Sequence, residues 1–513
     1  MQRRNEPPHL SVVAVSRNDD HGGDLRGRMQ HFVNGFIAQC RKHQLNAELL
    51  LVEWNPPPEQ PPLEAALEWP ADFGPAIVRI VSVPPRFHAS LPNSDALPLF
   101  QMIGKNVGIR RAHGRYVLAT NMDILFDDAT VLFLRDCVRP GTMLRADRYD
   151  VPGDLAKSVP FDRVLSECRS RYFQVHTRFG TFDVPRRRIV GHDDRLGARL
   201  LALYCEGRIL GWSDPLTRAA WRLHRAALAA RRRLVMASRS FLWHGRGVLA
   251  RASQTTLRAL RNIRAALLRG LPKLWPPNSL PSCGYWRIRR TFRRNLPKFR
   301  RVISLPNRGY WRVRRALRSG ARLWRKISSI SWKIAWFLKL SIVPQSSSQR
   351  RFTRMQRLHT NGCGDFTLLA RDDWFRLRGY PEWPIFSWHI DSIFMFAASA
   401  HGILEVPLSP RYRIYHIDHS KGSGWSPDGA AELFARLDRN GIPYISDEAV
   451  ECKRREFADA PSSAIVNGPD WGLADFDLLE REIIPIVNNP ETRSQRAFPL
   501  ETRNAPVRTE LIS

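Results

Sequence analysis

Short apolar runs alternate with helix-type patterns over the first part of the chain. The runs Leu10–Val15, Ala47–Glu53 and Ile77–Val83 are rich in Leu, Ile and Val, and each has the length of a buried β-strand. Apolar residues recur at helical spacing in Met29–Cys40, and a second helix pattern covers Phe100–Arg111. This order of elements predicts an α/β fold with a mainly parallel sheet and covering helices.

A further apolar run, Tyr116–Ala119, leads into the tripeptide Asn121-Met122-Asp123. Asn121 and Asp123 are two residues apart, so their side chains lie on one side of an extended chain. Ligands of open α/β sheets bind outside the carboxyl ends of the strands, and a carboxylate there can hold a hard cation. The alternative is an Asn/Asp turn that only closes the strand.

The net charge of +32 is concentrated in one segment. The lysines and arginines of Thr217–Leu340 account for the whole excess, and no Asp or Glu occurs between Thr217 and Cys363. The pattern of 280–290 returns at 305–315, with apolar residues on one side of a helix and arginines on the others. Such basic amphipathic helices are typical of binding to an anionic membrane surface. A solvated, disordered insertion and non-specific nucleic-acid binding are the alternatives, and no nucleic-acid motif supports the latter.

The seven cysteines are widely spaced and form no metal-binding or redox motif, so we expect reduced thiols. Residues 1–9 lack the apolar core of a signal peptide. The longest apolar run, Ile327–Val343, contains lysines and is a poor membrane span. These features predict a cytoplasmic protein that lies on the inner face of a membrane.

Several motifs follow one another in a definite order along the first part of the chain. They are Asn18-Asp19-Asp20 after the first strand, Glu53-Trp54-Asn55-Pro56 after the second, 104–110 in the second helix, Gly114-Arg115-Tyr116 and Asn121-Met122-Asp123. Together they resemble the GT-A fold, and glycosyltransferase family 2 in particular. Asn121 stands where the family has the first Asp of its Asp-x-Asp motif. The resemblance resumes at 364–371 and at 388–394, where Asp391 is the acidic residue that remains of a Glu-Asp pair.

The resemblance divides the chain into five parts. We expect a nucleotide-sugar-binding half at 9–153, an insertion at 154–357 with a mostly helical basic core at 217–340, a catalytic half at 358–428, a helical region at 429–488 and a disordered tail at 489–513. In the catalytic half, a strand within 364–371 is followed by a helix from Asp372, its expected N-cap, to Gly379.

The resemblance also implies a metal site between the two halves. Asp123 would be the main protein ligand of a Mn²⁺ or Mg²⁺ ion, with Asn121 beside it. His416 would be a further ligand. His419 lies in the same alternating pattern and is the second choice. For either histidine alone, a surface or core position is the alternative.

Asp391 would be the general base, because burial in an apolar helix can raise the pKa of a carboxyl group toward neutrality. Its alternative role is to cap that helix. His389 would orient Asp391 or contact the donor.

The nucleotide-sugar donor would meet residues at the ends of the first strands and on the second helix. The expected donor contacts are Asn18, Asp19, Glu53, Lys105 and Asn106, and a solvated loop or helix face is the alternative for each. The predicted function is transfer of a sugar from a nucleoside diphosphate, with UDP as the expected one, to a hydroxyl of a glycan or lipid-linked acceptor. The alternative is a non-catalytic GT-A protein that binds anionic lipid or nucleic acid through its arginine-rich segment.

Overall fold

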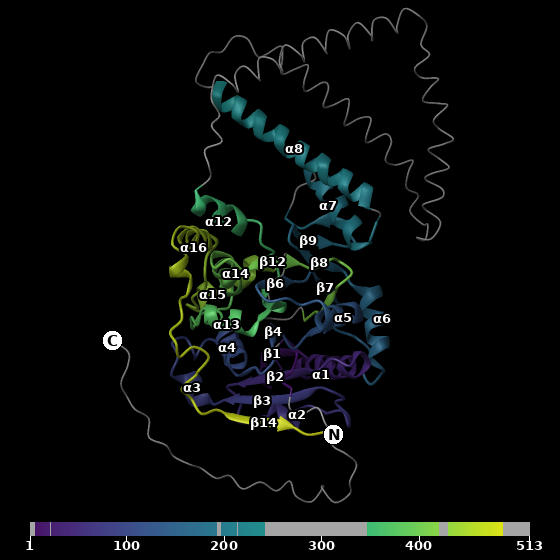
Figure 1. Ribbon diagram of the computed structural model, residues 1–513, viewed down its shortest axis with the longest axis vertical. Coiled ribbons are helices and arrows are strands. Elements are labelled where there is room, and N and C mark those ends of the chain that lie inside the picture. The colour runs from purple at the N-terminus through teal and green to yellow at the C-terminus, as the bar shows by residue number, and fades with distance from the viewer. Residues whose placement is uncertain are drawn as a thin grey trace, which may run out of the picture. The chain divides into compact units, whose positions relative to one another are not determined.

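The computed structural model describes residues 6–20, 22–191, 196–212, 214–241, 346–419 and 429–485 (Figure 1). Residues 1–228 and 346–513 belong to one compact unit. Most of the predicted basic segment 217–340 and the tail 489–513 lie outside the described residues. Among the described residues, no helix is both long enough and apolar enough to cross a membrane.

The main sheet is built around four parallel strands. They are β1 (Leu10–Ser16), β2 (Ala47–Trp54), β3 (Ile77–Val83) and β4 (Tyr116–Ala119). β1 lies in the centre, paired with β2 on one side and with β4 on the other. These strands confirm the predictions from the apolar runs, and the chain is of the α/β class.

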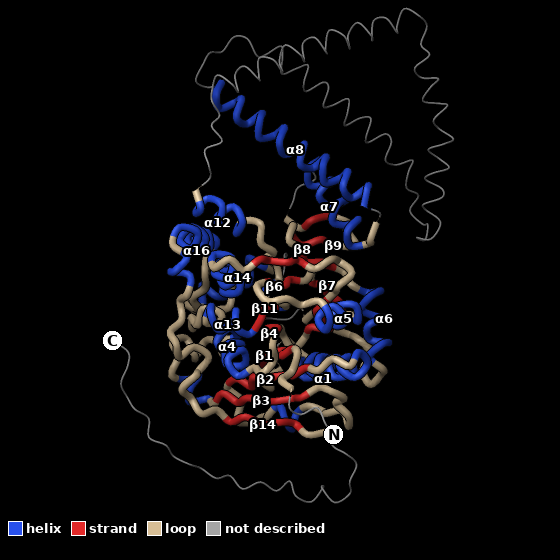
Figure 2. Tube along the Cα trace, in the orientation of Figure 1, coloured by secondary structure: helices blue, strands red, loops and turns tan. Residues whose placement is uncertain are grey.

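The part of the chain after residue 346 completes this sheet. β11 (Thr367–Ala370) lies antiparallel between β4 and β6 (Thr142–Arg145). β12 (Leu404–Pro407) and β14 (Leu479–Ile483) form the two edges, as the strand order shows (Figure 2). The predicted helical region 429–488 therefore also contains an edge strand.

Helices cover both faces of the sheet because the side chains of β1 alternate. Val12 and Ala14 pack with α1 (Leu25–His43), whereas Val13 and Val15 pack with α4 (Gln101–Arg111). Gly104 and Gly108 let α4 approach β1 closely. A Cβ on either glycine would lie 2.5 Å from a methyl group of Val15 or Val13. The glycines of the 104–110 motif thus have a packing role.

A second sheet joins the two halves of the interrupted chain. Its strands are, in order, β10 (Arg188–Ile189), β9 (Gly180–Asp183), β8 (Gln174–Thr177), β7 (Arg148–Val151), β13 (Ile414–Ile417) and β5 (Ile124–Phe126). β13 lies between β5 and β7, which both precede the insertion.

Residues after 153 continue the same unit. α6 (Phe161–Arg171), α7 (Leu196–Ile209) and the β8–β9 hairpin contribute to one hydrophobic cluster with β7 and β13. The compact unit therefore extends past the boundary that was predicted at 153, and it also includes 346–357.

The helices of the second half line the face of the main sheet that α4 covers. They are α12 (Ser347–Met355), α13 (Arg371–Leu377), α14 (Ile390–Ala400), α15 (Ala430–Arg439) and α16 (Asp447–Asp459). The N-cap of α13 is Ala370 and not Asp372, which lies in the first turn, so the predicted cap was wrong by two residues. Gly379 follows the helix with φ +70°, as a C-terminal stop requires.

Candidate functional site

The turn after β4 brings Asp123 beside β13. The hydroxyl of Thr120 donates to the carbonyl of Asp365 at 2.7 Å, and the amide of Ile417 donates to the carbonyl of Asp123 at 2.9 Å. These two bonds attach the turn to segments from the other half of the chain. Asp123 therefore has a fixed position at the carboxyl end of β4.

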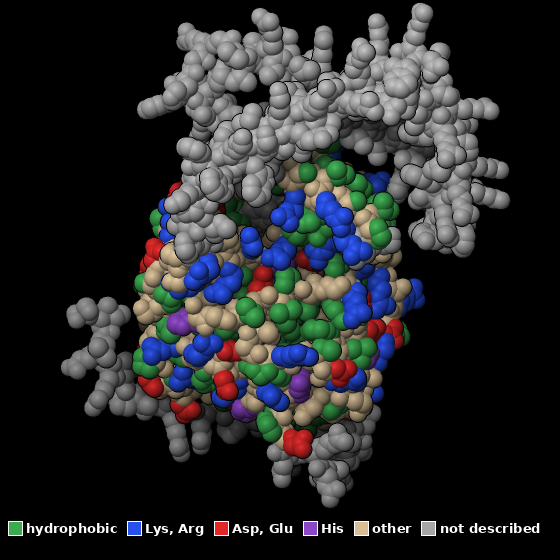
Figure 3. Space-filling model, turned by 45° about the horizontal axis from the view of Figure 1, so that its top comes forward, with side chains coloured by type: hydrophobic (Ala, Val, Ile, Leu, Met, Phe, Trp, Pro, Cys, Tyr) green, Lys and Arg blue, Asp and Glu red, His purple; other side chains and the backbone are tan. Residues whose placement is uncertain are grey.

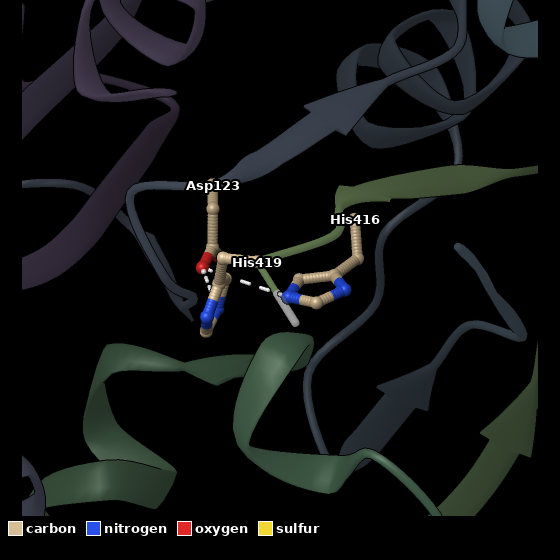
Figure 4. Close-up of side chains that lie close together, drawn as sticks. All are labelled: Asp123, His416 and His419. Atoms are coloured by element: carbon tan, nitrogen blue, oxygen red, sulfur yellow. Dashed lines mark ion pairs between the residues drawn. The ribbon is translucent and has the colours of Figure 1, made fainter. Parts of the chain in front are cut away.

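Three side chains converge at this point: Asp123, His416 on β13 and His419 just after it (Figure 4). Asp123 Oδ2 lies 3.2 Å from His419 Nε2 and 3.6 Å from His416 Nε2. The potential ligand atoms of the three residues all lie within 4.8 Å of one another. Asp123 Oδ1 is buried and has no hydrogen-bond partner. We refer to these residues as the Asp123 cluster.

The Asp123 cluster is strongly coupled electrostatically. Burial alone would raise the pKa of Asp123, but the two histidines outweigh it and hold this pKa well below its usual range. Burial and Arg148 both lower the pKa of His416, yet Asp123 and Asp150 raise it to about 10. An anionic oxygen without a partner beside two imidazoles is a donor set that fits a divalent cation. Two ligand atoms that bind one such ion at about 2.0–2.2 Å each must lie close to one another. The distances from Asp123 Oδ2 to the two imidazole nitrogens are compatible with this requirement.

Asp150 on β7 supports the Asp123 cluster from behind. Its Oδ1 lies 3.2 Å from His416 Nδ1, and its Oδ2 lies 2.8 Å from His176 Nε2. Arg148 pairs with Asp150 at 2.8 Å and with Asp365 at 2.7 Å. Burial would raise the pKa of Asp150, but Arg148 and His176 keep it well below its usual range. The carboxylate of Asp150 thus orients His416 so that Nε2 faces Asp123.

A cleft of about 470 Å³ opens beside His419. Its lining is Gly22, Gly23, Asp24, Arg28, Pro152, Gly153, Asp154, Arg171, Phe173, Asp418 and His419. Gly22 has φ +74°, and a Cβ there would lie 2.9 Å from His419 Nδ1, so only glycine fits. Burial lowers the pKa of Arg28, whereas Asp123 and Asp24 oppose this effect. Arg28 is therefore a cation between the cleft and the Asp123 cluster.

Asn121 does not join the Asp123 cluster through its side chain. Its Oδ1 accepts from Gln101 at 2.9 Å, and its Nδ2 donates to Asp365 Oδ1 at 2.7 Å. Both ends of its amide are thus bonded within the chain, and the metal-ligand role of Asn121 stays a prediction. His419, the second-choice histidine, is the third member of the Asp123 cluster.

Lys105 and Asn106 are fully buried on α4 and face the second half of the chain. Lys105 Nζ donates to the carbonyl of Gly364 at 2.7 Å. Asn106 bonds both backbone groups of Tyr380, each at 2.8 Å. These contacts differ from the predicted phosphate contacts, since neither side chain reaches the cleft.

The three donor contacts predicted at strand ends also have partners within the chain. Glu53 is buried and accepts from the Leu63 amide at 2.6 Å and from Ser82 at 3.0 Å. Burial raises its pKa. Asn18 donates to the carbonyl of Pro61, and Asp19 pairs with Arg17. Among the described residues, none of the three lines the cleft.

Asp391 lies in the first turn of α14, next to the buried polar groups of α4. Its Oδ1 accepts from the Ser392 amide at 2.7 Å, and its Oδ2 lies 3.1 Å from the point where a Cβ on Gly364 would be. The buried Lys105 interacts electrostatically with both Asp391 and Asp123. Asp391, the predicted general base, and Asp123, the predicted metal ligand, therefore both lie near Lys105, although neither is in the lining of the cleft.

His389 turns away from Asp391. It has φ +66°, and its Nε2 lies 2.9 Å from Asp447 at the start of α16. The predicted orienting role is thus not seen in the structure. Sequence reasoning missed Arg28, Arg148, Asp150 and His176; of these, Asp150 alone had a local signal, as an acidic residue at the end of a strand before Pro152-Gly153.

The comparisons with known proteins add no family: no family model matches the chain, and no curated protein matches its sequence.

Proposed function

We propose that this protein is a metal-assisted glycosyltransferase of the GT-A type that uses a nucleotide sugar as donor. The observation that carries the proposal is the Asp123 cluster. It unites a carboxylate at the end of β4 with two histidines from the other side of the insertion, and it leaves Asp123 Oδ1 without a partner. The adjoining cleft has the volume of a small-molecule site.

The position of the Asp123 cluster in the fold supports this proposal. It lies at the carboxyl end of β4 in a run of parallel strands, which is where open α/β sheets bind ligands. The antiparallel β11 next to β4 agrees with a mixed sheet of the GT-A kind. The first sequence motifs that resemble family 2 lie at or after the ends of β1, β2 and β4, and on α4.

Asp123, His416 and His419 would hold the cation. Imidazole ligands favour Mn²⁺ over Mg²⁺, because Mg²⁺ prefers oxygen donors. When bound, the ion would neutralise the diphosphate leaving group as a Lewis acid. Asp150 keeps His416 in the orientation that directs Nε2 toward this position.

Arg28 and the turn at Gly22-Gly23 would receive the donor phosphates. The turn approaches His419 with no side chain in between, so an anion in the cleft could lie against backbone, imidazole and guanidinium together. Arg28 thereby takes the role that the sequence assigned to Lys105. Asp391 would remove the proton of the acceptor hydroxyl, a role that rests on the family resemblance and on its place near Lys105.

The first test measures turnover of a panel of UDP- and GDP-sugars by the purified full-length chain, with Mn²⁺ and with EDTA. We expect Mn²⁺-dependent release of nucleoside diphosphate. Asp123→Ala should lower turnover more than about 100-fold, since it removes the anionic ligand. Asp136→Ala is the matched control, because Asp136 is an exposed aspartate on α5 (Asp128–Asp136) paired with Arg135. Full turnover by Asp123→Ala would contradict the assignment.

A second variant separates donor chemistry from acceptor activation. Asp391→Asn should lower transfer to an acceptor by at least about 100-fold but leave Mn²⁺ and nucleotide affinity unchanged. An equal loss of nucleotide affinity would instead place Asp391 in the donor site. If the protein neither binds nor turns over any nucleotide sugar in the presence of divalent metal ions, the non-catalytic alternative is the better explanation of its function.

A further inference from the structure

α7 and the first part of α8 (Asp214–Phe241) form an antiparallel hairpin on the outside of the second sheet. His224 Nδ1 bonds to the carbonyl of Gly197 at 2.9 Å, and Tyr204 stacks on Trp221 with ring centroids 4.9 Å apart. Near the turn, a Cβ on Gly207 would lie 2.3 Å from a methyl group of Thr217. The residue numbers of the partners run in opposite directions, which fixes the antiparallel arrangement.

Large apolar side chains on this hairpin remain exposed. Between 40% and 61% exposed are Leu196, Leu203, Leu210, Leu216, Leu223 and Leu228. The first five share a spacing, and we call them the leucine stripe. On and just after α7 the leucines recur every seventh residue, and the pair on α8 has the same spacing. Residues at this spacing lie on one face of a helix.

Both parts of the leucine stripe face the same side of the hairpin. Tyr204 faces α8. Leu203 precedes Tyr204 by one residue, so its side chain lies about 100° around the axis of α7 from that of Tyr204. Leu216 is likewise about 100° back from Thr217, which faces α7. Along its own helix, each leucine is displaced in the same sense from the residue that faces the other helix. Because α7 and α8 are antiparallel, these displacements bring Leu203 and Leu216 to the same side of the hairpin. On α7 that side is opposite Leu201 and Cys205, which pack in the core.

Charge selects the kind of partner. Arg199 lies between Leu196 and Leu203, and Arg222 adjoins Leu223. The acidic Glu206, between Leu203 and Leu210, is paired with Arg187 at 2.6 Å. From Thr217 to Cys363 the chain contains no acidic residue. Figure 3 shows Lys and Arg side chains among hydrophobic ones in the upper part of the described surface. An apolar stripe with arginines at its border, which continues into an acid-free sequence, complements an anionic, apolar-cored surface.

We propose that the leucine stripe docks the protein on an anionic lipid bilayer. The leucines enter the boundary between headgroups and acyl chains, while the arginines meet the lipid phosphates. This inference is independent of the proposed transferase activity, because the stripe lies outside the Asp123 cluster and the cleft.

The experiment is co-sedimentation of the full-length chain with vesicles of phosphatidylcholine and about 30% phosphatidylglycerol. It is done at low salt and in about 1 M NaCl, where the Debye length is about 3 Å and charge attraction is screened. The test variant is Leu203→Gln/Leu216→Gln/Leu223→Gln. The matched control changes three exposed leucines elsewhere, Leu132→Gln/Leu404→Gln/Leu479→Gln.

We expect the wild type and the control to keep part of their vesicle binding in 1 M NaCl, and the test variant to partition about tenfold less. Leu216→Gln and Leu223→Gln alone should each give a several-fold loss, which separates docking from misfolding of the triple variant. The proposal would be overturned if the test variant and the wild type sedimented with the vesicles to the same extent, or if the wild type did not bind the vesicles. The proposal would also be overturned if light scattering showed a dimeric wild type and a monomeric test variant. The leucine stripe would then be an interface between copies of the chain.

Discussion

Two groups of buried polar side chains, both predicted as site residues, differ in whether all of their polar atoms have hydrogen-bond partners within the protein. Lys105 and Asn106 are bonded within the chain, to Gly364 and Tyr380. The Asp123 cluster leaves Asp123 Oδ1 buried without a partner. Because an unpaired buried oxygen costs free energy, such an atom in a native fold indicates a place for something else to bind.

The satisfied group has a different task, which the interruption of the chain makes necessary. Lys105 and Asn106 come from the first half, whereas Gly364 and Tyr380 come after the insertion. Their bonds hold the second half against α4, next to β11. The comparison teaches that buried polar residues of one motif can serve assembly, whereas those of another remain available for the proposed metal site.

The largest effect on this comparison should come from Asn106→Ala. It leaves the Tyr380 amide without its acceptor and opens a small cavity, so we expect a loss of about 2–4 kcal/mol in the free energy of unfolding. Asn34→Ala is the control, since Asn34 is an exposed asparagine on α1. Chemical denaturation measures the loss. If Asn106→Ala instead weakened donor binding at unchanged stability, the predicted phosphate contact would be restored.

Lys105→Met should change how stability depends on pH. Burial lowers the pKa of Lys105 to about 8, although Asp365, Asp391 and Asp123 oppose it. Between that value and the ordinary lysine pKa, the unfolded chain holds a proton that the folded chain lacks. Wild-type stability should therefore rise with pH across this window, by up to about 1.4 kcal/mol per pH unit relative to Lys105→Met.

The control for this prediction is Lys157→Met, because Lys157 is an exposed lysine paired with Asp24. It should leave the pH slope as in the wild type. Parallel slopes of wild type and Lys105→Met between pH 8 and 10.5 would show that burial does not lower the pKa of Lys105.

The sequence was sufficient for elements whose signal is local. The strands at 10–16, 47–54, 77–83 and 116–119 and the helix at 101–111 follow from runs and periods of apolar residues. Asp123 and His416, which the structure brings together, were singled out through the resemblance to the GT-A fold. Lys105 was misplaced, because nothing in a helix sequence tells whether a lysine points to solvent or to a segment that is joined through a long insertion.

Asp150 and Arg28 could not be assigned for a related reason. Asp150 meets His416 only because β13 inserts between β5 and β7, a pairing across more than half of the chain. Arg28 approaches the Asp123 cluster through the turn at Gly22, which is set by its contact with His419. Such long-range pairings are decided by tertiary packing and not by local propensity.

The smallest predicted effect is that of Asp150→Asn, which keeps the size of the side chain but removes its charge. Asp150 orients His416 and pairs with Arg148. The asparagine amide should therefore hold the His416 imidazole less firmly, while the second sheet stays folded. We expect Mn²⁺ affinity, measured by titration calorimetry, to fall about tenfold, in the usual range for a residue that supports a metal ligand. Asp183→Asn is the matched control, because Asp183 is a buried aspartate on β9 that pairs with Arg186. A tenfold loss in Asp150→Asn alone would place Asp150 with the unsatisfied group, whereas equal Mn²⁺ affinity in both variants would place it with the residues that only assemble the fold.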